Sequence, residues 1–265
     1  MFPSIVDFGA FRIPTYGVLL VTGIVMGLWT AHRRARTVGR LDPERVVDFG
    51  IWVALWGLAG SKLLLVVTEP GYVTSLSGLK GLLRAGGVFY GGLIGALVAA
   101  VVLVRRYHLQ LWPLVDTLAP SVALGHFFGR LGCFGAGCCY GASCDLPWAV
   151  TYTHPLAAEI SGTPLGIPLH PTQLYEAAFN LCNYLFLAWL FGRRPRDGSV
   201  LASYLLTYGA GRFCLELLRG DPDRGFVLGG LLSTSQAIAV GMVLIGIGIL
   251  VWTWMASRRT AAVRH

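Results

Sequence analysis

Four side chains able to bind an anion or move a proton recur in the last third of the chain. Tyr208, Arg212, Glu216 and Arg219 follow one another at intervals of four, four and three residues. These intervals place all four on one face of a helix. One interpretation is an internal ion pair between Arg212 and Glu216. The other is an anion-binding site, because a guanidinium group holds phosphate oxygens through a planar fork of N–H donors.

A glycine-rich segment carries a further arginine. Glycine occurs at five positions from Gly129 to Gly141, and Arg130 and Gly132 lie within this segment. Such a density of glycine ends a helix and lets backbone N–H groups approach a ligand closely. A flexible turn is the simpler interpretation, but an arginine inside the turn favours an anion site.

A second glycine-rich segment runs from Gly86 to Gly95, with two glycine pairs on either side of Val88-Phe89-Tyr90. Its spacing favours close packing of two helices through small residues over a catalytic role. Tyr90 is the side chain in this segment that can move a proton, and it is therefore a candidate site residue.

Polar residues also open the apolar segment that follows residue 170. His170 lies at the predicted N-cap of a helix and Pro171 at its first position, where proline is favoured. Capping does not explain Gln173, Tyr175 and Glu176 in the first turns. We interpret these residues as the lining of a polar pocket.

Four of the six cysteines lie within 12 residues, and their spacing matches no common zinc-binding pattern. They are Cys133, Cys138, Cys139 and Cys144. In an oxidising compartment, we favour the interpretation that these cysteines form a disulfide or are buried thiols. Direct contact with a substrate is the second interpretation of the cluster, and a metal site is the third. Cys182 and Cys214 are interpreted as packing residues.

The elements that must position these side chains are membrane helices. Of the 265 residues, 55% are hydrophobic and only 13% are charged, whereas about a quarter are charged in soluble domains. Seven apolar runs approach the roughly 20 residues that a spanning helix needs. They cover residues 16–32, 48–67, 88–104, 112–131, 171–192, 199–218 and 235–256. The sequence therefore predicts one all-α membrane domain over residues 1–265, a bundle of seven transmembrane helices, and excludes an ordinary soluble enzyme.

The basic residues predict the orientation, because lysine and arginine accumulate in cytoplasmic connections. Thirteen of the 21 lie beyond the first, third, fifth and seventh runs. The N-terminus is therefore expected in the periplasm and the C-terminus in the cytoplasm, with residues 133–170 forming a small periplasmic head. The first 14 residues lack the features of a cleavable signal peptide. These short basic clusters contact membrane lipids and do not form the basic face that nucleic-acid binding requires.

Ionisable side chains inside membrane helices are costly, at about 2.5–3.5 kcal/mol each on insertion scales. Arg130, Arg212 and Arg219 outnumber the acids expected near the outer half of the bundle. A phospholipid headgroup is the anion that is always present at this depth. We therefore interpret the three arginines as a headgroup-binding site.

These segments resemble those of bacterial prolipoprotein diacylglyceryl transferases over nearly the full length of the chain. The resemblance rests on the joint order of six segments. They are Tyr16-Gly17, Gly86–Gly95, Asp116-x-x-Ala119-Pro120, Gly129–Gly141, His170–Glu176 and Tyr208–Arg219.

The resemblance implies transfer of the diacylglyceryl group of phosphatidylglycerol to the lipobox cysteine in prolipoprotein signal peptides. The implied products are a thioether-linked lipid and glycerol 1-phosphate, formed without a metal or a diffusible cofactor. The implied location is the bacterial inner membrane, with the site facing the periplasm. The chain departs from the common family pattern at Cys133, Cys138 and Tyr90, where asparagine, glutamate and a histidine cast as the general base are usual. We interpret it as a cysteine-rich variant of the family.

The expected roles follow from this reaction. Arg130 and Arg212 hold the phosphate, Glu216 orients Arg212, and Tyr90 bonds the headgroup or relays a proton. The other predicted substrate contacts are Tyr16, Gly132, Cys133, Cys138, Gly141, His170, Gln173, Tyr175, Glu176, Tyr208 and Arg219. Two other functions remain open, namely an anionic-lipid carrier without chemistry and a thiol-redox membrane protein built on the cysteine cluster.

Overall fold

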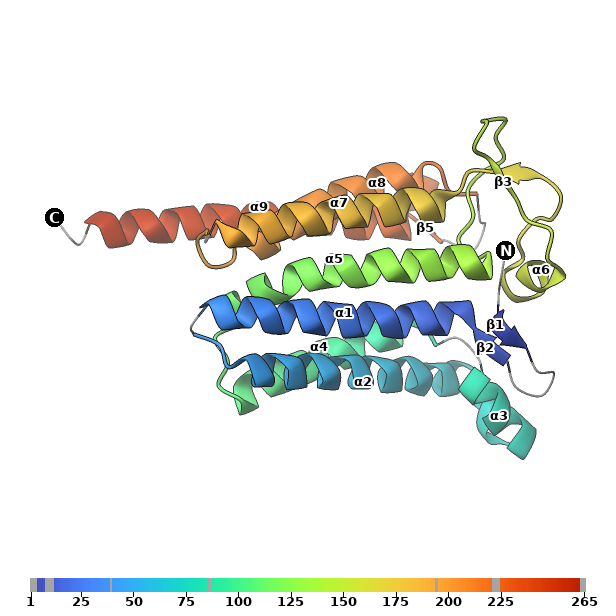
Figure 1. The fold of residues 1–265 in the computed structure, drawn as a ribbon, viewed down its shortest axis with the longest axis horizontal. Coiled ribbons are helices and arrows are strands. Elements are labelled where there is room, and N and C mark those ends of the chain that lie inside the picture. Colours follow the sequence, from blue (N-terminus) through green and yellow to red (C-terminus); the bar gives the residue numbers. More distant parts are fainter. Residues whose placement is uncertain are drawn as a thin grey trace. The chain divides into compact units, whose positions relative to one another are not determined.

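A computed structural model describes residues 4–7, 12–38, 40–84, 87–193, 195–220 and 225–262, so that Gly86 lies outside the described residues. A helix coincides with each of the seven apolar runs (Figure 1). These helices are α1 (Thr15–Val38), α2 (Pro43–Thr68), α4 (Phe89–Arg106), α5 (Leu111–Ala136), α7 (Thr172–Gly192), α8 (Ser199–Glu216) and α9 (Thr234–Ala262).

Three of these helices are long and apolar enough to cross a membrane by length and composition alone. They are α1, α2 and the part of α9 from Thr234 to Ser257. Helices α5, α7 and α8 carry the ionisable residues Arg130, Glu176 and Arg212. The described chain is thus a mostly helical membrane protein.

The helices belong to two compact units. One contains Met1–Thr30 and Val115–His265, and the other contains Ala31–Leu114. All the predicted site residues except Tyr90 belong to the first unit.

In the unit of residues 31–114, α2 and α4 pack through glycines. A β-carbon on Gly60 would collide with the carbonyl oxygen of Gly91, and one on Gly92 would lie 3.2 Å from that of Gly57. The interpretation of this segment as a close helix contact is therefore confirmed. A 3-10 turn (Pro70–Val73) and α3 (Leu76–Arg84) connect the two helices. Tyr90 lies in the first turn of α4 and is 49% exposed.

In the other unit, α8 packs against α7 and α9 (Figure 1). Buried residues of α5, α7 and α8 form its core. They are Ala119, Ala123, Leu187, Val200 and Tyr204. The buried Asp116 carboxylate on α5 accepts hydrogen bonds from the backbone N–H of Gly198 (2.6 Å) and of Leu201 (2.8 Å). Asp116 thereby satisfies free donors at the start of α8 and fixes the helix that carries Arg212 and Glu216.

The chain between α5 and α7 folds into a head. Strand β3 (Val150–Thr151) pairs antiparallel with β4 (Pro168–Leu169), and α6 (Pro155–Ser161) lies between them in the sequence. Tyr140, Tyr152 and Leu169 form its small core. Two further antiparallel pairs are β1 (Ser4–Asp7) with β2 (Arg12–Pro14), and β5 (Phe226–Val227) with β6 (Leu232–Ser233), where a short 3-10 turn (Leu228–Gly230) connects the strands.

Candidate functional site

The glycine-rich segment Gly129–Gly141 does not end the helix where the sequence predicts, because α5 continues to Ala136 and Arg130 therefore lies in a helix and not in a turn. The end of this segment, after α5, brings three predicted site segments together. The backbone N–H of Gly141 donates to the carbonyl of His170 (3.1 Å), and that of Ala142 donates to the carbonyl of Leu218 (2.9 Å). A β-carbon on Gly141 would lie 2.5 Å from the His170 β-carbon, so only glycine fits here. The end of α5, the start of α7 and the end of α8 therefore meet at one place.

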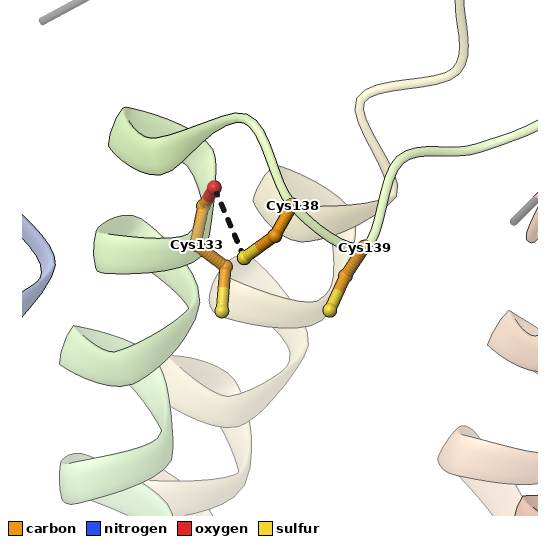
Figure 2. Close-up of side chains that lie close together, drawn as sticks. All are labelled: Cys133, Cys138 and Cys139. Carbon is orange, nitrogen blue, oxygen red and sulfur yellow. Dashed lines mark hydrogen bonds between the residues drawn. The ribbon is translucent and has the colours of Figure 1, made fainter. Parts of the chain in front are cut away.

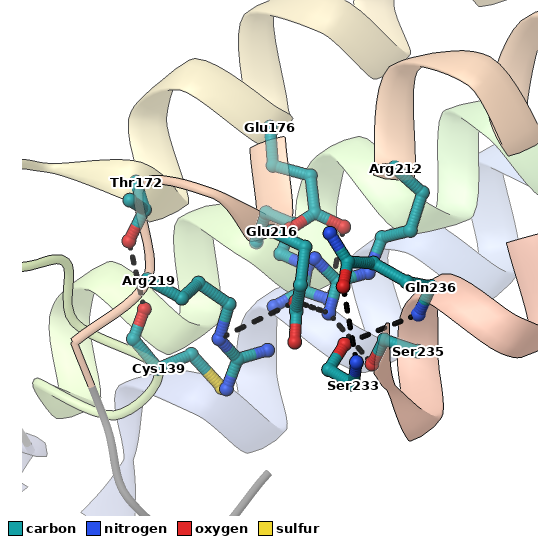
Figure 3. Close-up of polar contacts among 10 residues, drawn as sticks. Cys139, Thr172, Glu176, Arg212, Glu216, Arg219, Ser233, Ser235 and Gln236 are labelled. Atoms are coloured by element: carbon teal, nitrogen blue, oxygen red, sulfur yellow. Dashed lines mark hydrogen bonds and ion pairs between the residues drawn. The ribbon is translucent and has the colours of Figure 1, made fainter. Parts of the chain in front are cut away.

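The three arginines at this place contact two buried carboxylates. Arg130 Nη2 lies 2.9 Å from Glu176 Oε1, Arg212 Nη2 lies 2.7 Å from Glu216 Oε2, and Arg219 Nε lies 3.9 Å from the same Glu216 oxygen. Figure 3 shows the residues around Glu216. The ion pair between Arg212 and Glu216 is confirmed. The predicted excess of arginine over acid also holds among the described residues, with three guanidinium groups to two carboxylates, although each of the three contacts one of these carboxylates. Glu176 is predicted to line a polar pocket at the start of α7, and its carboxylate contacts Arg130 of α5.

Three guanidinium groups and two carboxylates leave this cluster with one excess positive charge. Arg212 is only 8% exposed. Its Nη2 also donates to the hydroxyl of Ser235 at 3.1 Å. Its Nη1 is buried and has no hydrogen-bond partner among the described residues. A buried donor without a partner costs roughly 1–3 kcal/mol, and more when it is charged, so an anionic ligand that accepted this bond would be favoured.

Ser235 is held against Arg212 by the start of α9. Gln236 N–H donates to the Ser233 hydroxyl at 3.1 Å, and Ser233 N–H donates to Gln236 Oε1 at 3.0 Å. This reciprocal pair is a capping box and fixes the first turn of the helix. Ser235 is not among the predicted site residues, although the spacing of Ser233 and Gln236 predicts this helix start.

Two tyrosines predicted for the site lie beside its backbone and its arginines. Tyr16 on α1 covers Gly132, where a β-carbon would come within 3.0 Å of the tyrosine ring. The ring of Tyr208 on α8 contacts that of His126 in a tilted arrangement, with 5.1 Å between ring centroids, and Tyr208 lies near Arg130. Both tyrosines thus lie next to the part of α5 that carries Arg130 and Gly132.

The predicted polar residues of α7 divide into two groups. Tyr175 accepts a hydrogen bond from Trp148 Nε1 at 2.7 Å and lies 3.4 Å from His170 Nδ1. Gln173 is instead buried and donates to the carbonyl of Cys138 (2.7 Å) and the hydroxyl of Tyr152 (2.9 Å). Burial raises the pKa of Tyr152 to about 12. Gln173 therefore positions the cysteine-containing loop from inside the protein.

All six cysteines are free thiols, and three of them converge. The sulfur atoms of Cys133, Cys138 and Cys139 all lie within 4.8 Å of one another (Figure 2). Hydrogen bonds from the thiols of Cys133 and Cys138 hold the pKa of Cys139 well below its ordinary value, and the positive charges of Arg130 and Arg219 act in the same direction. Cys144 is not part of this group among the described residues.

These features define a class, a helical membrane protein with a buried arginine site that carries excess positive charge. Residues 3–252 match the family described as prolipoprotein diacylglyceryl transferase. The chain is 33% identical over 247 residues to a Clostridium tetani protein, covering 93% of this chain and 96% of the relative. It is 31% identical over 268 residues to one from Azotobacter vinelandii (99% and 97%) and 33% identical over 268 residues to one from Pseudomonas aeruginosa (98% and 95%).

All three relatives are named phosphatidylglycerol–prolipoprotein diacylglyceryl transferase. The chain belongs to the prolipoprotein diacylglyceryl transferase family.

Proposed function

We propose that this protein transfers the diacylglyceryl group of phosphatidylglycerol to the lipobox cysteine of prolipoproteins. The observation that carries the proposal is the buried Arg212 guanidinium, whose Nη1 has no partner among the described residues, within a cluster of net charge +1. A phosphodiester carries one negative charge and would balance the cluster. The names of the relatives supply the identity of the lipid and of the acceptor.

In the proposed reaction the nucleophile is the thiol of the substrate. The new bond joins its sulfur to the terminal carbon of the diacylglyceryl group, and the bond from that carbon to the phosphate oxygen breaks. Glycerol 1-phosphate leaves with the bonding electrons, and the thiol proton is released. Negative charge therefore grows on the phosphate oxygen in the transition state.

Arg130 and Arg212 would stabilise this growing charge. The Glu216 carboxylate, 2.7 Å from Arg212, and the Glu176 carboxylate, 2.9 Å from Arg130, keep the two guanidinium groups in place. One well-placed donor of this kind contributes roughly 10²–10³ in rate. Arg219 adds positive charge next to Glu216, and Tyr208 lies beside Arg130.

The other predicted contacts complete the proposal. Tyr16 would line the lipid entrance beside Gly132, and Tyr90 would bond the headgroup or relay a proton. His170 and Tyr175 would meet the acceptor peptide at the head, where Trp148 orients the Tyr175 hydroxyl at 2.7 Å.

The proposed setting is the bacterial inner membrane. We propose that all seven helices span it as one transferase domain, with the N-terminus and the site on the periplasmic side and the C-terminus in the cytoplasm. The apolar surfaces of α1, α2 and α9 support the membrane location, and the asymmetric distribution of arginine supports the orientation.

The test is transfer of labelled diacylglyceryl from phosphatidylglycerol vesicles to a synthetic lipobox peptide, with the thioether product identified by mass spectrometry. Arg212→Gln is expected to lower the rate at least about 100-fold. The matched control Arg36→Gln changes an exposed arginine in the last turn of α1 and should leave the rate unchanged. Full activity of Arg212→Gln would contradict the proposed site. Binding of phosphatidylglycerol without any thioether product would instead identify a lipid carrier.

A further inference from the structure

The three converging cysteines have a geometry that suits a metal ion. Thiolates bound to Zn²⁺ at about 2.3 Å lie about 3.8 Å apart in a tetrahedral site. The sulfur atoms of Cys133, Cys138 and Cys139 already lie within 4.8 Å of one another (Figure 2). They would have to close by about 1 Å or less to bind the ion. The sequence spacing conceals this set because the turn after α5 folds two of the cysteines back onto the third.

The backbone that carries these sulfur atoms is held from several sides. Thr172 donates to the carbonyl of Cys139 at 2.9 Å, and Gln173 donates to that of Cys138 at 2.7 Å. Cys139 has a φ of 60°, a left-handed conformation that costs a residue with a β-carbon about 1–2 kcal/mol. The surrounding hydrogen bonds therefore keep the third sulfur in the cluster against this cost. A disulfide would engage only two of the three sulfur atoms and would not account for the third.

We propose that Cys133, Cys138 and Cys139 form a binding site for a thiophilic divalent cation of the zinc type. Three protein ligands leave the fourth tetrahedral position open, as in zinc sites that accept an outside ligand. On the basis of the proposed function, we assign this position to the thiol of the incoming prolipoprotein cysteine, because thiolates are preferred ligands of such ions. The predicted contacts of Cys133 and Cys138 with substrate would then be made through the ion.

This arrangement would replace a general base. A thiol that coordinates zinc loses its proton to water. Its sulfur then forms the bond to the glyceryl carbon while the bond from that carbon to the phosphate oxygen breaks, and the electron pair leaves with glycerol 1-phosphate. The thiolate is thus generated although tyrosine, at Tyr90, stands where the family usually has a histidine.

The first experiment measures the metal content of the purified full-length protein after equilibration with Zn²⁺ and removal of the excess. We expect about one ion per chain for the wild type and less than about 0.1 for Cys138→Ser/Cys139→Ser. Cys182→Ser/Cys214→Ser is the matched control, since it removes two exposed cysteines of α7 and α8, and it should keep the full content. A chain that lacks only the Cys139 thiol should lose binding, and histidine at this position, in Cys139→His, should restore it. Equal uptake by the wild type and the cluster variant would overturn the site.

The second experiment tests the open position. In protein loaded with Co²⁺, a lipobox peptide should increase the sulfur-to-cobalt absorption, whereas the same peptide with serine in place of its cysteine should not. Removal of the metal should lower transfer at least about tenfold, with recovery on adding Zn²⁺. Undiminished transfer by metal-free protein would overturn the thiol-binding step and leave the proposed function intact. Stoichiometric zinc without any transfer would contradict the proposed function and leave the metal site intact.

Discussion

The ion pair between Arg130 and Glu176 allows a direct test of whether Arg130 serves the substrate or merely neutralises a buried acid. The two side chains lie 2.9 Å apart, and that of Glu176 is 5% exposed whereas that of Arg130 is 20% exposed. Breaking a buried pair by removing one partner costs about 3–5 kcal/mol, because the other charge is left uncompensated. Arg130→Gln is therefore expected to destabilise the protein by this amount. Glu176→Gln should lower the stability by less, since the Arg130 side chain that it leaves unpaired is 20% exposed and keeps some contact with solvent.

The double variant Arg130→Gln/Glu176→Gln separates the two roles. Two neutral amides can hydrogen-bond to each other, so we expect most of the lost stability to return. Transfer activity should remain roughly 10²–10³-fold below that of the wild type, because the donor to the phosphate is still missing. Arg130→Lys should keep the ion pair but lose the planar fork, and its activity should lie between those of the wild type and Arg130→Gln.

The measurements are thermal unfolding in detergent, followed by tryptophan fluorescence, and transfer to a lipobox peptide at a temperature where all variants are folded. Recovery of transfer to within about threefold of the wild type in the double variant would refute the reasoning. Arg130 would then act only as the counter-ion of Glu176, and the phosphate site would have to be built from Arg212 and Arg219 alone.

Three further predictions concern the support of the site. Asp116→Ala removes both hydrogen bonds to the start of α8 and should lower the unfolding free energy by roughly 3–6 kcal/mol at about 1.5–3 kcal/mol per bond, whereas the exposed control Asp48→Ala should stay near the wild type in the same thermal unfolding assay. Gly141→Ala should abolish most transfer because its β-carbon would collide with His170, whereas Gly129→Ala, with no atom within 4 Å of its β-carbon, should retain it. The thiols of Cys133 and Cys138 lower the pKa of Cys139, so in metal-free protein the rate of its alkylation by iodoacetamide should stay constant from about pH 8 to about pH 6. The rate for free cysteine falls about tenfold per pH unit over this range. A parallel fall at Cys139, measured by mass spectrometry, would contradict the lowered pKa.

The helices could be predicted from the sequence because apolar runs of membrane length leave the backbone no alternative to a helix. The close packing of α4 through its glycines was also predictable, whereas its partner α2, which approaches at Gly57 and Gly60, is known only from the structure. The sequence also predicts spans at α5, α7 and α8, but these helices are not among those long and apolar enough to cross a membrane by composition alone. Their ionisable residues lower the mean hydropathy, and the same residues form the site.

The partners of the arginines could not be predicted, because they depend on contacts between helices distant in the sequence. The spacing of four residues predicted the ion pair between Arg212 and Glu216, because both lie on one helix. Arg130 and Glu176 are 46 positions apart, and only the meeting of α5 with α7 joins them. The cysteines illustrate the same limit, since a ligand set assembled by a turn with a left-handed residue at Cys139 has no fixed spacing rule.

The charge balance of the arginine cluster fits a reaction in which charge develops late. Two carboxylates compensate most of the guanidinium charge and so reduce the cost of burying three arginines in a membrane helix bundle. The remaining charge of +1 matches a phosphodiester in the ground state. As the carbon–oxygen bond breaks, the leaving phosphate gains further negative charge, and the cluster then stabilises the transition state more than the bound lipid. A cluster with three unpaired arginines would instead hold the lipid too tightly before reaction, since binding substrate and transition state equally well does not raise kcat.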